Sequence, residues 1–187
     1  MKLILLFCLC LAGVNVVGDE LAESYKFQNR IYSQTNQMAA QLRMSLSNIS
    51  SKISVKVEPG TFFIVENTRR EVVKEKGSGL GLQGYELDVP TRRGFVISVS
   101  VRSGVYLNAL SRTLDPYFYK TPESKIKERD FYRAYTRVTI PEPQAYIIMD
   151  CYYGASMDTQ KLHRVYSAVR SNLVESVKAL GRAAEQK

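Results

Sequence analysis

Tryptophan is absent from this chain of 187 residues, and histidine occurs once, as His163. Nucleophilic catalysis by the common constellations needs a histidine that moves protons, and a zinc site needs a set of Cys and His ligands. The only soft ligands after residue 18 are Cys151 and His163. We expect His163 to face solvent on a helix, and we expect no metal, no cofactor and no enzymatic activity of these classes.

Cysteine is also scarce, and two of the three cysteines, Cys8 and Cys10, lie in an N-terminal segment with the pattern of a secretory signal. Lys2 precedes an apolar run of residues 3–12, and Gly18 precedes Asp19. As a helix this run spans about 15 Å, roughly half of a bilayer's hydrocarbon core. We therefore predict a signal peptide at 1–18, cleavage before Asp19, and a secreted, extracellular protein.

Long hydrophobic runs are missing from the rest of the chain, so no transmembrane segment is expected. Residues 19–187 are enough for a single domain that buries its own core. Cys151 is the only cysteine of this domain, so an intramolecular disulfide is excluded. Because Cys151 lies in the apolar run 146–153, we expect it to be buried; pairing with another chain is the alternative.

Two regions have helical periodicity, one at each end of the domain. The first covers 21–53, with a break expected near Asn36 or 45–51 because the segment is unusually long. Its apolar positions are Leu21, Tyr25, Tyr32, Ala39, Leu42, Leu46, Ile49 and Ile53. The second helix should start at Ser156 or Asp158 and end at Gly181. Its apolar positions are Leu162, Val165, Tyr166, Val169, Leu173, Val177 and Leu180.

The residues between these helices alternate with a period of two, which is typical of strands. Clear strands are predicted at 95–101 and 132–140, and shorter ones at 61–65, 85–89 and 145–152. Links such as 141–144 are too short for parallel crossovers. The pattern predicts an α+β domain, with an antiparallel sheet of about four to five strands and both helices packed on it.

Two motifs have weak functional signals. The segment 79–84 has the glycine spacing of a dinucleotide-binding loop, but a predicted strand follows it where that loop requires a helix. A hairpin connection is the better interpretation. Asn48-Ile49-Ser50 is an N-glycosylation sequon, and Asn48 is a candidate glycosylation site in a secreted chain.

The most distinctive polar segment is 117–137, where basic and aromatic residues are interleaved. The chain as a whole carries a formal charge of +8. Basic groups attract anionic polymers or surfaces through counterion release, and aromatic rings add stacking contacts. A charged edge strand that prevents aggregation is the alternative explanation. The candidate anion-binding residues are Lys125, Lys127, Arg133, Tyr135 and Arg137.

Three functions remain open. The first is a secreted, non-enzymatic binding protein for an anionic glycan, an anionic lipid surface or an acidic protein, with nucleic acid not expected outside the cell. The second is an extracellular carrier of an apolar ligand in a pocket between the helices and the sheet. The third is a hydrolase that uses paired carboxylates. Candidate acids for the third are Asp88, Asp115, Glu123, Glu128, Asp130 and Asp150. The sequence leaves the oligomeric state open.

Overall fold

The structure, a computed structural model, describes residues 2–74, 84–104, 117–120 and 131–185. The elements in chain order are α1 (Lys2–Ser47), β1 (Ser54–Glu58), β2 (Thr61–Lys74), β3 (Gly84–Ser103), β4 (Tyr117–Lys120), β5 (Phe131–Ile140), β6 (Ala145–Gly154) and α2 (Thr159–Glu185). Among the described residues, no helix combines the length and the apolar character needed to cross a membrane.

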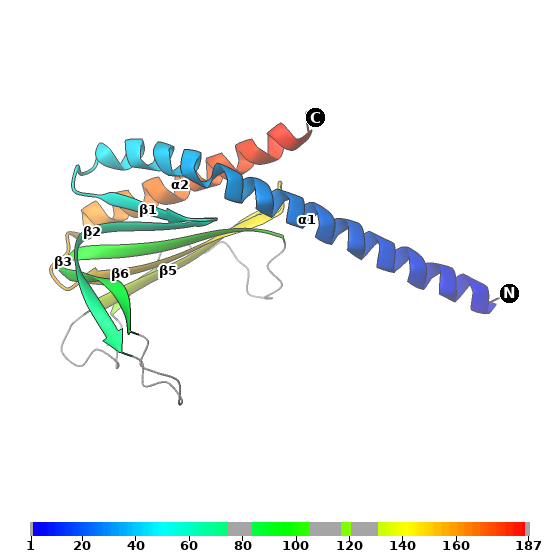
Figure 1. The fold of residues 1–187 in the computed structure, drawn as a ribbon, viewed down its shortest axis with the longest axis horizontal. Helices are drawn as coiled ribbons and strands as arrows, with labels where there is room; N and C mark the ends of the chain where they lie inside the picture. Colours follow the sequence, from blue (N-terminus) through cyan, green and yellow to red (C-terminus); the bar gives the residue numbers. More distant parts are fainter. Residues whose placement is uncertain (1, 75–83, 105–116, 121–130, 186–187) are drawn as a thin grey trace.

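One antiparallel sheet forms the body of the domain. Its strand order is β1-β2-β3-β6-β5-β4, and every neighbouring pair is antiparallel. Both helices lie on the same side of the sheet, where they contact each other (Figure 1). The predicted α+β class, with an antiparallel sheet and one helix from each end of the domain, is confirmed.

Helix α2 follows its sequence pattern closely. Six of the seven predicted apolar positions are buried, and Leu180 is partly buried. Asp158 caps the helix, since its Oδ1 accepts hydrogen bonds from the backbone nitrogens of Gln160 (2.9 Å) and Lys161 (3.1 Å). The helix does not end at Gly181. It continues to Glu185, and Gly181 instead allows close contact with the ring of Pro143.

Helix α1 follows its predicted pattern in part. It continues through Asn36 and ends at Ser47, which confirms the second of the two regions where a break was expected. Leu21 and Tyr25, expected on the buried stripe, are 65% and 76% exposed, whereas Ile31 and Met38 are buried. The reason is the register of the helix, because Ser24 and Gln28 hydrogen-bond to Ser103 at the end of β3 and Phe27 packs on the core. Leu21 and Tyr25 are not among the residues that make these contacts.

The central strands are longer than predicted, and β1 and β4 were not predicted. The expected strands 85–89 and 95–101 are parts of β3, which continues through Pro90. Residues 84–90 pair with β2 and not with β6, so Pro90 lies in a part of β3 that has one described neighbour, the kind of edge position where proline is tolerated in a sheet. A register shift between Glu66 and Thr68 places Asn67 at a φ of 51° and marks where the β2–β3 ribbon leaves the sheet.

The core fills the layer between the sheet and the two helices. Phe62, Ile97 and Met149 from the sheet and Leu42 and Leu173 from the helices are each at most 1% exposed. Cys151 is free and fully buried in this layer, as expected, and burial raises the pKa of its thiol well above the ordinary value. A thiol held in this protonated form is a poor nucleophile, so we assign Cys151 to packing.

Candidate binding face on the helix-free side of the sheet

The sheet face opposite the helices carries the described part of the predicted anion-binding segment. Along β5, Ala134, Thr136 and Val138 face the core, so the alternate positions 133, 135 and 137 face away from the helices. The structure thus brings Arg133, Tyr135 and Arg137 together on one surface. Lys125 and Lys127, the other two predicted site residues, lie outside the described residues.

Arg133 makes two hydrogen bonds and two ring contacts on this face. Its Nε and Nη2 donate hydrogen bonds to Oδ1 and Oδ2 of Asp150 on the neighbouring strand β6, at 2.8 and 2.7 Å. The two parallel bonds fix the plane of the guanidinium. The same guanidinium lies 5.5 Å from the ring centroid of Tyr152 and 6.0 Å from that of Tyr135, within the range of cation–π attraction.

Arg137 lies on the same face of β5, two residues after Tyr135. Its Nη2 donates a hydrogen bond to the Tyr135 hydroxyl (3.0 Å), and its guanidinium lies 6.0 Å from the Tyr135 ring. Tyr152, Arg133, Tyr135 and Arg137 therefore form a row in which aromatic and basic side chains alternate. We call these four residues, with Asp150, the Arg–Tyr row. It carries a net charge of +1 when Asp150 is ionised.

Asp150 and Tyr152 were not among the predicted site residues. Their alternation with buried neighbours in β6 is visible in the sequence, but their position beside Arg133 follows from the pairing Tyr135↔Asp150 and Arg133↔Tyr152. On the other side of β5, Tyr117 and Tyr119 of β4 stand opposite Tyr135 and Arg133 in the backbone register. The register therefore gives the row its neighbours on both sides.

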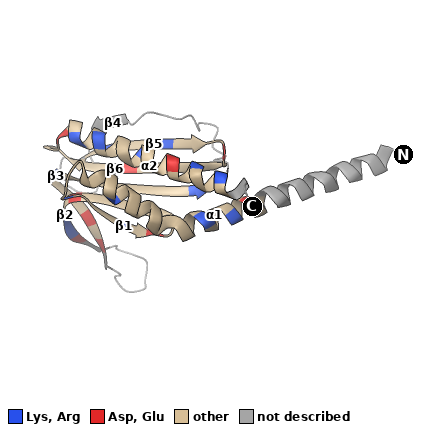
Figure 2. Ribbon diagram, turned by 90° about the horizontal axis from the view of Figure 1, so that it is seen from above, with Lys and Arg blue, Asp and Glu red and all other residues tan. Residues whose placement is uncertain are grey.

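Charge alone does not single out this face. Figure 2 shows basic and acidic residues of the described chain interspersed over both helices and the strands. What distinguishes the Arg–Tyr row is the fixed geometry of its side chains, which reduces the conformational entropy lost when a ligand binds.

The carboxylates proposed for a hydrolase do not form a pair in the described part of the chain. Asp88 is ion-paired with Lys56, and Asp150 with Arg133. Asp115, Glu123, Glu128 and Asp130 lie outside the described residues. His163 is exposed on α2, and the described residues contain no cluster of three or more metal-ligating side chains.

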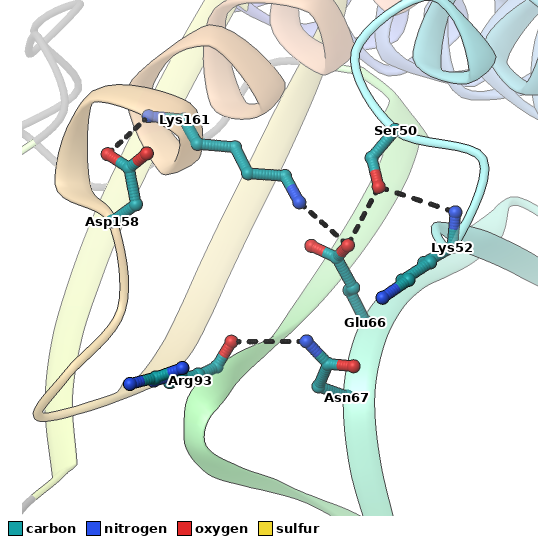
Figure 3. A network of polar contacts seen from close by, with 7 residues as sticks. All are labelled: Ser50, Lys52, Glu66, Asn67, Arg93, Asp158 and Lys161. Atoms are coloured by element: carbon teal, nitrogen blue, oxygen red, sulfur yellow. Dashed lines mark hydrogen bonds and ion pairs between the residues drawn. The ribbon is translucent and has the colours of Figure 1, made fainter.

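A second polar cluster, not predicted from the sequence, lies where β2 bends (Figure 3). Glu66 is 2% exposed, and its Oε1 accepts hydrogen bonds from Lys161 Nζ (2.7 Å) and Ser50 Oγ (2.8 Å). The cluster joins the turn after α1, the bend of β2 and the first turn of α2. Since Glu66 lies on the core side of the sheet, we interpret this cluster as structural.

The two weak motifs are placed as follows. Asn48 is exposed in the turn after α1, while Ile49 packs on the core and the Ser50 hydroxyl is bound to Glu66. The glycine segment 79–84 lies outside the described residues except for Gly84, which begins β3. Because β2 and β3 on either side of it are antiparallel neighbours, the segment connects a hairpin, as the sequence predicted.

Comparison with known proteins gives no relative from which a function could be transferred, because no family model, curated protein or solved structure matches the chain.

Proposed function

We propose that the protein is a secreted, non-enzymatic binding protein whose helix-free sheet face recognises an anionic partner, such as an anionic glycan, an anionic lipid surface or an acidic protein. The observation that carries the proposal is the Arg–Tyr row, in which two guanidinium groups and two phenol rings from adjacent strands are held in one surface. Guanidinium groups suit sulphate and carboxylate oxygens, and the rings add contact area.

Asp150 has a specific part in this proposal. It neutralises Arg133 and fixes its orientation, so Arg133 acts mainly as a stacked, planar donor. Arg137 supplies the net positive charge of the described row, and Lys125 and Lys127 add to it from the same segment of the sequence. The ligand should therefore bind by a mixture of charge and stacking.

Secretion forms part of the proposal and rests on the sequence of residues 1–18. Cleavage before Asp19 leaves Asp19 and Glu20 as the first residues of the helix, with Glu23 one turn later. Negative charge is favourable at this end of a helix, because the helix dipole is positive there. The mature chain would thus begin with a helix start that the precursor does not have.

Heparin chromatography of protein purified from the medium tests the proposal, and sequencing of the same material should find Asp19 at the N-terminus. The site variant carries Lys125→Gln, Lys127→Gln and Arg137→Gln. We expect it to elute at lower salt and to show a weaker salt dependence, with the slope falling by roughly 0.7–0.9 for each lost ionic contact.

A matched control removes the same number of charges from α2 through Arg164→Gln, Lys178→Gln and Arg182→Gln, all at exposed or partly exposed positions. Lys161 is unsuitable for this control because it neutralises the buried Glu66. Equal losses of retention in the two variants would show that bulk charge governs adsorption, and the binding face would be rejected.

A further inference from the structure

A cavity of about 670 Å³ lies at the end of the sheet, where α1 leaves the body of the domain. One wall is a face of α1, and the other is the end of β3 together with the β5–β6 turn, residues 141–144. Its volume is typical of small-molecule sites in proteins. It is distinct from the Arg–Tyr row. Glu23, Lys26, Phe27 and Arg30 line it from α1, and Glu142 and Gln144 line it from the turn.

Hydrogen bonds hold the two walls in place. Ser103 donates from its backbone nitrogen to Gln28 Oε1 (2.8 Å) and from its hydroxyl to the Ser24 carbonyl (2.6 Å), which ties α1 to the end of β3. Gly104 donates to the Gln144 carbonyl (2.8 Å), which ties β3 to the β5–β6 turn. The walls are therefore positioned by contacts that do not involve a ligand.

The charges around the cavity are balanced but not paired. Lys26 and Arg30 stand one helical turn apart on the same face of α1, an arrangement of like charges that disfavours the helix. Glu23 lies on that face as well, and Glu142 lies on the turn opposite. Within the described part of the chain, none of these four side chains makes an ion pair with another residue. Between the charges, Phe27, Pro141 and Pro143 supply apolar contact.

We infer that this cavity binds a small zwitterion of di- or tripeptide size. A ligand with charge of one sign would meet two like charges of the protein, whereas a zwitterion can place a carboxylate near Lys26 and Arg30 and an ammonium near Glu23 and Glu142. Its apolar body would lie against Phe27 and the two prolines. This site differs from the apolar pocket of the carrier hypothesis, both in position and in the chemistry of its lining.

Equilibrium dialysis of the purified protein with Ala-Ala and Ala-Ala-Ala tests the inference. The matched probes are the N-acetylated peptides, which keep only the carboxylate, and the peptide amides, which keep only the ammonium. We expect saturable binding of the zwitterions and at least about tenfold weaker binding of both blocked forms, because each loses one charge-assisted contact.

Two variants assign the charges to the lining residues. Arg30→Gln should weaken zwitterion binding and reduce the preference over the amide, and Glu142→Gln should reduce the preference over the acetylated peptide. Arg164→Gln and Glu58→Gln, at exposed positions elsewhere, should change neither. Absence of saturable binding at millimolar peptide, equal binding of the blocked forms, or unchanged binding by the two cavity variants would overturn the inference. None of these results bears on the heparin experiment, so the two proposals fail separately.

Discussion

The two faces of the sheet are built from the same strands but held by different interactions. Toward the helices, side chains such as Ile97, Met149 and Cys151 have no exposed surface, and they are fixed by close packing. On the opposite face, Arg133 and Asp150 keep 36% and 24% of their side chains exposed, and they are fixed by hydrogen bonds and ring contacts. Stability should therefore depend on the first face, and recognition on the second.

The largest expected effect concerns Glu66, the one carboxylate on the core side of the sheet among the described residues. Lys161→Met removes its cation and leaves a buried charge without compensation. We expect the free energy of unfolding, measured by urea denaturation at neutral pH, to fall by about 3–5 kcal/mol.

The matched control for this variant is Glu66→Gln combined with Lys161→Met, which removes both charges and should recover part of the loss. A cost below about 1 kcal/mol for Lys161→Met would mean that the ion pair behaves like a surface pair. The core side of the sheet would then be no more important for stability at Glu66 than the helix-free side.

Packing on the core side gives the next effect. Leu173 is fully buried on α2, so Leu173→Ala should lower the free energy of unfolding by about 2–5 kcal/mol through lost burial and a residual cavity. Val174 is only partly buried, and Val174→Ala should cost about 1 kcal/mol or less. Similar urea midpoints for the two variants would contradict the assigned buried face of α2.

The two helices show what sequence periodicity can and cannot predict. The apolar stripe of α2 matched its buried face because the helix lies over the sheet for most of its length. In α1 the stripe was placed wrongly at Leu21 and Tyr25, because the side chains that meet β3 and the core at this end are those of Ser24, Phe27 and Gln28. Apolar periodicity misses a covered face where part of it is lined by polar residues, as it is by Ser24 and Gln28.

The candidate site was predictable to a similar degree. A period of two places Arg133, Tyr135 and Arg137 on one face, and it does so without any knowledge of strand pairing. Asp150 and Tyr152 became their neighbours through the register of β5 against β6, which the sequence did not reveal. The Glu66 cluster could not be predicted from the sequence, because Glu66 and Lys161 are 95 residues apart in the chain.

The smallest effect, and the most direct comparison of the two faces, comes from the Arg133–Asp150 pair. Both side chains retain solvent contact, so screening by water reduces the strength of their attraction. We expect Arg133→Gln and Asp150→Asn each to lower the free energy of unfolding by about 1 kcal/mol or less, with a coupling energy of about 0.2–1 kcal/mol in a double-mutant cycle. A cost near that of Lys161→Met would mean that the helix-free face also stabilises the fold. Weak coupling together with reduced heparin retention of the Arg133→Gln, Asp150→Asn double variant, whose net charge is unchanged, would instead indicate that the pair serves to orient Arg133 for binding.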